Sequence, residues 1–136
     1  MAYAETVNET SAIGNPYAQE AEERWPSQYR ESQRRLSKLS SDEQRAVFNQ
    51  HEAIATELAE LFKAGAAAES TEVQALIGRH YDWITNFWTP SREAYVGLGQ
   101  MYAADERFTA NYDKFAAGLA VFMSSSMTLW ADANLV

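Results

Sequence analysis

The stretch "SDEQRAVFNQHEAIATELAELFKAG" (residues 41–65) carries the clearest periodic pattern in this 136-residue chain. Its apolar-face residues recur at steps of three and four, which is the spacing of one face of an α-helix. They are Val47, His51, Ile54, Leu58, Leu61 and Phe62. "SDEQ" at 41–44 predicts a capping box in which Ser41 caps the helix and Gln44 reaches back. Gly65 predicts the end of a long amphipathic helix.

Helical patterns also follow this stretch. Ser70 predicts the cap of a helix whose stripe is Val73, Leu76, Ile77, His80, Tyr81, Ile84, Phe87 and Trp88. Thr89-Pro90 predicts a break and the start of another helix, with Ala94, Tyr95, Leu98, Met101 and Tyr102 on its face. "ADERF" (104–108) predicts an Asp-capped helical turn, and a last long helix is expected from about Tyr112 to about Ala131.

The chain before residue 41 predicts two less stable helices. Asn15-Pro16 is typical of a helix start, and Pro26 ends that helix after Trp25. Ser27 is expected to cap a second helix up to about Leu39, which is mostly charged and has little to bury. Residues 1–14 predict a flexible arm, and residues 15–136 a single domain. No segment alternates like a β-strand, so we expect an all-α fold of six or seven helices with marginally stable N-terminal helices.

Composition narrows the possible partners and compartments. The formal net charge of −8 disfavours contact with nucleic acid phosphates and with anionic membranes. The first residues show neither a basic start nor an apolar run, and no stretch approaches the roughly 20 apolar residues of a membrane span. We therefore expect a cytoplasmic protein that contacts neither nucleic acid nor membrane.

The side chains needed for common catalytic and metal sites are scarce. The absence of cysteine excludes disulfides, thiolate catalysis and zinc–thiolate sites. Only two histidines occur, His51 and His80, and both lie on apolar stripes, where a hydrogen-bonded core or cleft-edge imidazole is the simpler interpretation. Haem ligation by His80 is not favoured, because no second histidine or equivalent group is placed opposite it. No metal, cofactor or enzymatic activity is therefore expected.

Aromatic residues are the feature left unexplained. Trp and Tyr bring polar atoms that need partners, and this chain has more such rings than one thin core requires. Trp83 carries most weight, because it lies off the stripe of its own helix and so is expected to face something other than the core. The set as a whole predicts an apolar cleft with a few polar groups, which is how sites for drug-sized ligands are lined.

Three sequence motifs resemble those of a known protein family. "RWPSQYRES" (24–32), "RHYDWITNFW" (79–88) and "GLGQMYAADERFTANYD" (97–113) resemble the TipA-type antibiotic-recognition domain, or TipAS domain, in the right order. The resemblance covers the chain from about Glu20 onward. It implies a globin-like all-α fold without haem, and reversible binding of a bulky, largely apolar antibiotic such as a thiopeptide. It also implies N-terminal helices that close over the ligand as a lid.

The sequence departs from this family at one informative position. The thiopeptide-trapping member uses a cysteine immediately before "LGQMY", where this chain has Gly97. Covalent capture through a thiol is therefore excluded, and the ligand is left open between a thiopeptide and another hydrophobic antibiotic. The family commonly forms the effector domain of MerR-type transcription activators and also occurs alone. Met1 and the acidic charge favour the stand-alone form.

We therefore expect a non-covalent drug-binding domain. The expected ligand-binding residues are Trp25 and Tyr29 from the lid, and His80, Trp83, Phe87, Trp88, Tyr95, Tyr102, Tyr112 and Phe115 from the floor and wall. The rings would exclude water, and His80 and the tyrosine hydroxyls would orient the ligand. The alternative is a protein–protein interaction module, in which the same rings form an exposed patch or a homodimer interface.

Overall fold

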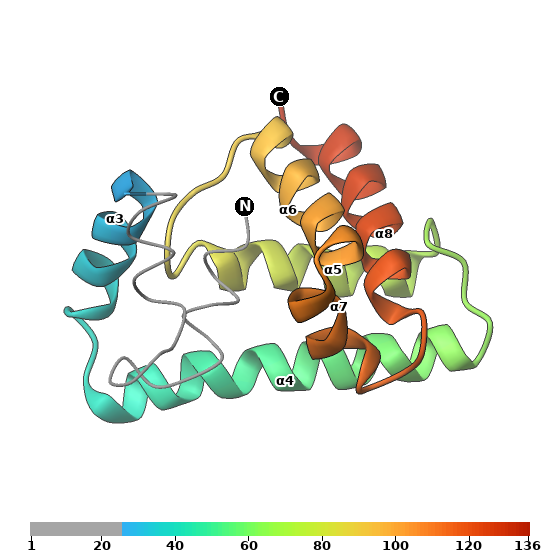
Figure 1. The fold of residues 1–136 in the computed structure, drawn as a ribbon, viewed down its shortest axis with the longest axis horizontal. Helices are drawn as coiled ribbons and strands as arrows, with labels where there is room; N and C mark the ends of the chain where they lie inside the picture. Colours follow the sequence, from blue (N-terminus) through green and yellow to red (C-terminus); the bar gives the residue numbers. More distant parts are fainter. Residues whose placement is uncertain (1–25) are drawn as a thin grey trace.

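The computed structural model describes residues 26–136, and six α-helices make up this part of the chain (Figure 1). They are α3 (Pro26–Leu36), α4 (Ser41–Lys63), α5 (Thr71–Ile84), α6 (Arg92–Ala104), α7 (Glu106–Asp113) and α8 (Leu119–Asn134). No strand occurs between residues 26 and 136, so the predicted all-α class is confirmed there. The predicted arm, the helix at 16–25 and Trp25 lie outside the described residues.

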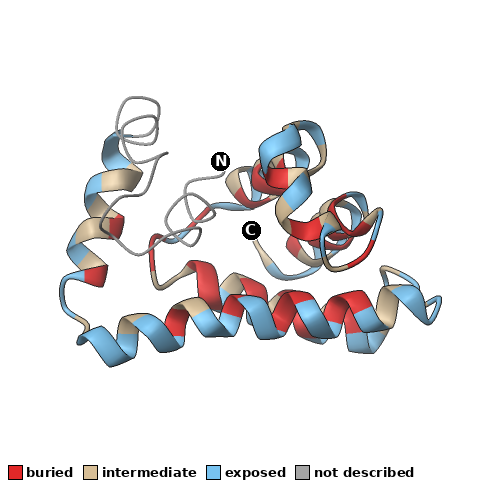
Figure 2. Ribbon diagram, turned by 60° about the horizontal axis from the view of Figure 1, so that its bottom comes forward, coloured by how far each residue is buried: buried red, intermediate tan, exposed pale blue. Residues whose placement is uncertain are grey.

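The long helix α4 runs along one side of the described part of the chain, and the other helices lie on the same side of α4 (Figure 1). α5 packs against α4, and α8 packs most extensively on α6 while also contacting α4, α5 and α7. α3 stands at the N-terminal end of α4. The buried hydrophobic residues form one core on the inward faces of α3 to α8 and on the connection between α5 and α6, and buried residues are red in Figure 2. None of the helices in this range is long and apolar enough to cross a membrane.

The start of α4 is displaced by one residue from the prediction. Ser40 is the cap: its Oγ accepts from the Glu43 N–H at 3.1 Å, and a Glu43 oxygen accepts from the Ser40 N–H at 2.9 Å. The predicted pair, Ser41 and Gln44, has the same spacing but does not form the capping box. The Gln44 amide instead donates to the carbonyl of Leu36 at 2.9 Å, and thereby satisfies the last turn of α3. The capping-box motif was correctly recognised but placed one residue too late.

The connection between α5 and α6 is longer than predicted. α5 ends at Ile84, so Phe87 and Trp88 lie on the connection and not on the helix. The Asn86 side chain donates to the Trp83 carbonyl at 2.9 Å, and such local bonds compete with continuation of a helix. Pro90 further disfavours helical backbone at Thr89. α6 then begins at Arg92, with Ser91 as its cap.

The predicted last helix is in fact two helices. α7 ends at Asp113 and α8 begins at Leu119, so Tyr112 and Phe115 are not part of α8. The chain turns at Gly118, whose φ of 89° is a conformation that favours glycine. An Asp113 oxygen accepts from the Ala120 N–H at 3.0 Å and so satisfies the start of α8. The predicted caps Ser70 of α5 and Asp105 of α7 are confirmed.

A glycine sets the close contact between α6 and α8. A Cβ atom at Gly99 would lie 3.2 Å from the Cα of Ser124 and 3.2 Å from Sδ of Met127. Because the first of these atoms is backbone, the two helices would have to separate to make room. Gly97, on the same helix, has nothing within 4 Å of the equivalent position.

This difference predicts opposite effects for two neighbouring substitutions. Gly99→Ala should lower the free energy of unfolding by about 1–3 kcal/mol through overpacking. Gly97→Ala should raise it by roughly 0.5–1 kcal/mol, since alanine is the better helix former. Urea unfolding of both variants measures the difference. Equal values for the two would show that α6 and α8 are not held this close.

Candidate functional site

Six of the ten predicted ligand-binding residues come together in one cluster of rings. Trp83 lies 5.0 Å from Phe87 and 5.8 Å from His80, measured between ring centroids. His80 is 5.8 Å from Tyr95 and 6.1 Å from Tyr102, and Tyr102 is 4.7 Å from Tyr112. We call His51, His80, Trp83, Phe87, Tyr95, Tyr102 and Tyr112 the ring cluster. It draws its members from α4, α5, α6, α7 and the 85–91 connection.

His51 completes this cluster, although it was not among the predicted ligand-binding residues. Its ring lies 4.6 Å from that of Trp83 and 5.4 Å from that of Tyr112. Its Nε2 is 2.8 Å from the hydroxyl of Tyr112. The interpretation of His51 as a hydrogen-bonded core imidazole is therefore confirmed. Its position on the apolar stripe of α4 was the signal that placed it there.

Hydrogen bonds tie the ring cluster to itself and to the backbone. Nδ1 of His80 is 2.8 Å from the hydroxyl of Tyr95, and both residues are fully buried. Burial raises the pKa of the Tyr95 hydroxyl well above its usual range, so this group stays protonated at physiological pH. The cluster thus combines apolar contact with paired polar atoms, which favours one fixed arrangement of α4, α5, α6 and α7.

Trp83 lies in the core, contrary to the prediction. The side chain is only 2% exposed, and its Nε1 donates to the carbonyl of Val47 on α4 at 2.7 Å. Trp83 therefore does not face away from the core, as its position off the predicted stripe had suggested. The stripe was drawn too narrowly, because α5 packs against α4 as well as α8 and so buries more than one face. Whether Trp83 also contacts a ligand stays a prediction.

The other predicted residues are spread around this cluster. Tyr29 is half-buried on α3 and packs against the core, and Trp88 is buried on the connection. Phe115 follows α7 and is half-buried, with Nζ of Lys114 lying 5.3 Å from its ring centroid. No ring contact joins Phe115 to the cluster within residues 26–136. Trp25 lies outside the described residues.

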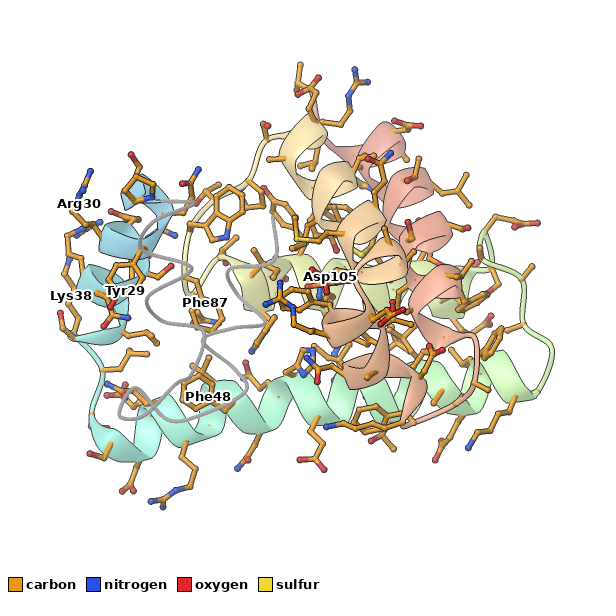
Figure 3. All side chains as sticks on the ribbon, in the orientation of Figure 1. Tyr29, Arg30, Lys38, Phe48, Phe87 and Asp105 are labelled. Carbon is orange, nitrogen blue, oxygen red and sulfur yellow. The ribbon has the colours of Figure 1, made fainter. Side chains whose placement is uncertain are left out.

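Phe48 is a candidate that the sequence analysis missed. In Figure 3, Tyr29 from α3, Phe48 from α4 and Phe87 from the connection project into one region, bounded by these three segments. Tyr29 and Phe48 are half-buried and pack against the core, whereas Phe87 is fully buried. Phe48 directly follows Val47 and so lay beside the predicted stripe of α4. Its size and its partial exposure are the signals that distinguish it from the core residues.

Trp88 carries an unsatisfied polar atom. Its side chain is 7% exposed, and Nε1 has no hydrogen-bond partner in the part of the chain that the structure describes. A buried N–H without an acceptor costs roughly 1–3 kcal/mol, so native proteins usually pair such groups. Trp88 therefore offers a donor that a bound molecule could satisfy.

Polar contacts fasten α3 beside Trp88. Ser32 is fully buried, and its hydroxyl donates to the carbonyl of Phe87 at 3.3 Å. Arg35 donates to the carbonyl of Thr85 at 2.8 Å. Hydrogen bonds from Arg34 and Arg35 lower the pKa of the Glu31 carboxyl to about 2. Glu31 therefore stays ionised at physiological pH, and its pairing with the two arginines would be lost only as the pH falls from about 4.5 toward 2.

Two shallow grooves lie along the seam of α4 and α5. One, of about 360 Å³, is lined by Glu57, Glu60, Leu61, Glu72, Ala75, Leu76 and Arg79. The other, of about 350 Å³, is lined by Gln50, Ile54, Arg79, Asp82, Trp83 and Asn86. Trp83 is the one predicted ligand residue among these linings. Between residues 26 and 136, no group of three or more His, Asp or Glu side chains is placed to hold a metal ion.

The chain is similar to one protein family and to several transcriptional regulators. Residues 17–130 match the model of the TipAS antibiotic-recognition domain. The HTH-type transcriptional regulator SkgA of Caulobacter vibrioides is 36% identical over 81 residues, which are 58% of this chain and 32% of SkgA. The HTH-type transcriptional activator mta of Bacillus subtilis is 29% identical, over 75% of this chain and 39% of mta.

TipA and TipAS extend the comparison to longer alignments. The HTH-type transcriptional activator TipA of Streptomyces coelicolor is 28% identical, over 82% of this chain and 45% of TipA. The chain thus spans less than half the length of these curated relatives. Among solved structures, TipAS of Streptomyces lividans in complex with nosiheptide matches with a TM-score of 0.79 and 25% identity. The match covers 96% of this chain and 92% of that chain. That TipAS protein is part of a thiopeptide antibiotic multidrug resistance system.

The position of Trp83 predicts a large loss of stability on truncation. Trp83→Ala removes a buried ring, its stacking on His51 and its bond to Val47, and should lower the free energy of unfolding by about 3–5 kcal/mol. Leu129, which is 42% exposed on α8, provides the control. Leu129→Ala should change the same quantity by about 0.5 kcal/mol or less. Thermal or urea unfolding decides, and a Trp83→Ala protein as stable as the control would contradict the packing described.

Proposed function

The chain belongs to the TipAS antibiotic-recognition domain family, and from this premise we propose that it binds a bulky, largely apolar antibiotic of the thiopeptide type. Its fold is the globin-like all-α arrangement of that family, as the sequence predicted. The observation that carries the proposal is the match to TipAS in complex with nosiheptide, which extends over 92% of that chain.

The proposed binding is non-covalent. The chain has no cysteine, so no thiol is present to add to the ligand. Affinity would come from the burial of aromatic surface, at roughly 1.5–3 kcal/mol for each fully buried ring. A few such rings, less the cost of ordering the ligand and the protein around it, correspond to dissociation constants from about micromolar to about nanomolar. No catalytic step is part of the proposal.

We place the site where α3, the N-terminal half of α4 and the 85–91 connection meet. Tyr29, Phe48 and Phe87 project into this region, and Trp88 contributes an indole N–H in need of an acceptor. In this proposal, the more deeply buried residues support the wall from behind. They are His80, Trp83, Tyr95, Tyr102 and Tyr112. Phe115, and Trp25 outside the described residues, keep the ligand-binding role that the sequence predicted for them.

The role in a larger protein follows from the relatives. SkgA, mta and TipA are HTH-type transcriptional regulators, and the similarity covers only part of each. The domain is therefore proposed to act as the drug-sensing part of such a regulator, or as a stand-alone protein that sequesters the drug. In both cases the chemistry is the same: a rise in the concentration of the antibiotic fills the site.

The competing interpretation, an interface built from the same rings, has less support. The rings of the cluster are at most 5% exposed, so they offer little surface to a protein partner. An interface needs several hundred square ångströms of accessible surface from each partner. A homodimer through another surface stays a prediction, and the mass of the purified protein in solution would test it.

A titration tests the proposed function directly. Adding nosiheptide to the purified chain should change its tryptophan fluorescence in a saturable way, with a dissociation constant between about micromolar and nanomolar. The intact mass should be unchanged afterwards, because no thiol is available. If neither nosiheptide nor other thiopeptides or hydrophobic antibiotics change the signal, the proposal fails.

Trp88 provides a sharper prediction for the same site. Trp88→Phe keeps an aromatic ring but removes the N–H, so it should weaken nosiheptide binding by about tenfold. The free protein should change in stability by no more than about 1 kcal/mol, because relief of an unpaired donor offsets part of the lost ring volume. Trp130→Phe on α8 is the control and should bind within about twofold of the original chain. Equal affinities for both variants would remove Trp88 from the site.

A further inference from the structure

Two residues of α3, Ser32 and Leu36, are buried in the part of the chain that the structure describes. Tyr29, Ser32 and Leu36 follow one another at steps of three and four, and therefore lie on the same face of α3. This face is turned toward the connection that carries Phe87 and Trp88, because the hydroxyl of Ser32 donates to the carbonyl of Phe87. Whatever holds this face in place also sets the position of Tyr29.

Arg35 attaches α3 to the end of α5 through a charged donor. Its Nη1 donates to the carbonyl of Thr85 at 2.8 Å and lies 3.3 Å from the hydroxyl oxygen of Thr89. Thr85 is the C-cap residue of α5. The carbonyl end of a helix carries partial negative charge, and α5 has no basic residue of its own in its last turn. Arg35 therefore supplies the cation for α5 from another helix, about 50 residues earlier in the chain.

Glu31 holds Arg35 in the orientation that this contact requires. One Glu31 oxygen accepts from Nε of Arg35, which leaves Nη1 directed at the connection. Arg34 also pairs with Glu31, at 2.6 Å and 3.0 Å. Within the described residues, however, the side chain of Arg34 makes no polar contact outside α3. The two arginines thus share a carboxylate, but only Arg35 connects α3 to α5 and the connection.

We propose that Arg35 is the positioning residue of the site: by capping α5 from α3, its guanidinium holds Tyr29 in place beside Phe87 and Trp88. This inference rests on the proposed function in so far as Tyr29 and Trp88 belong to the ligand site. The attachment itself is a property of the free protein. Loss of Arg35 loosens α3, and the ligand then has to fix α3 as well as fill the site, which lowers its affinity.

Two neighbouring substitutions separate this role from a general effect of charge. Arg35→Met removes the guanidinium that caps α5 and keeps an unbranched, apolar side chain at this position. Arg34→Met removes an equal charge and a bond to the same Glu31, so it is the matched control. Arg35→Lys keeps the positive charge, but an ammonium group cannot bond Glu31, Thr85 and Thr89 together as the guanidinium does. This variant should therefore keep part of the attachment of α3 that Arg35→Met loses.

Amide hydrogen exchange of the free protein is the first measurement. Arg35→Met should speed exchange of the α3 amides by about tenfold, because a hydrogen bond to a charged group no longer holds the helix. Exchange in α8 should not change. Arg34→Met should leave α3 within about twofold of the original chain. Equal exchange of α3 in the two methionine variants would overturn the proposal.

Binding of nosiheptide is the second measurement. Arg35→Met should weaken binding by about tenfold, Arg34→Met by less than about twofold, and Arg35→Lys by an intermediate factor. A faster-exchanging α3 with unchanged affinity would overturn the positioning role, because α3 would then lie outside the site. If the original chain binds no thiopeptide, the proposed function fails. The exchange experiment still decides in that case whether Arg35 holds α3, since it needs no ligand.

Discussion

The contact on which the rest of the structure depends is the buried pairing of histidines with tyrosines across the helices. His51 of α4 lies against Tyr112 of α7, and His80 of α5 lies against Tyr95 of α6. The indole of Trp83 lies against both imidazoles and is bonded to the backbone of α4. Because each buried polar atom of such a pair needs its partner, shifting one helix would leave a donor or an acceptor unpaired. The ring cluster therefore fixes how four helices sit together.

A rigid centre of this kind explains how one small domain can present a site on its edge. The connection that follows α5 starts from the ring cluster, since the ring of Phe87 packs against that of Trp83. Trp88 comes next in the chain, and α3 is fastened to the same connection through Ser32 and Arg35. The proposed ligand region is thus supported by the core on one side and bounded by α3 on the other. A region of this kind, lined by aromatic side chains and a few polar groups, suits the reversible binding of a large apolar molecule.

The helices could be predicted from the sequence because their signals are local. The apolar stripe of α4, the caps Ser70 and Asp105 and the glycine after α4 depend on residues within one or two turns. The errors arose where two local signals competed. Ser40 and Ser41 both start a capping-box pattern, and tertiary contact chose between them, because Gln44 is used to satisfy α3. The break at Gly118 was missed for a similar reason: periodicity continued through a turn that Asp113 and a glycine make possible.

The candidate site was less accessible to sequence reasoning than the fold. Six of the predicted ligand-binding residues come together with His51, but their rings pack against one another, and their role in ligand binding stays a prediction. Trp83 is buried because α5 packs between α4 and α8, which covers a second face of this helix. The spacing of residues within α5 does not reveal this packing. Arg35 looked like one charge among several on a polar helix, because its partners at Thr85 and Thr89 are about 50 residues away.

The central claim is that the antibiotic binds between α3, the start of α4 and the 85–91 connection. Amide hydrogen exchange of the chain, compared with and without saturating nosiheptide, tests it most directly. The account predicts slower exchange in residues 26–36 and 85–91, with α8 unchanged. Protection confined to α8 or to the grooves between α4 and α5, with α3 and the connection unaffected, would contradict it.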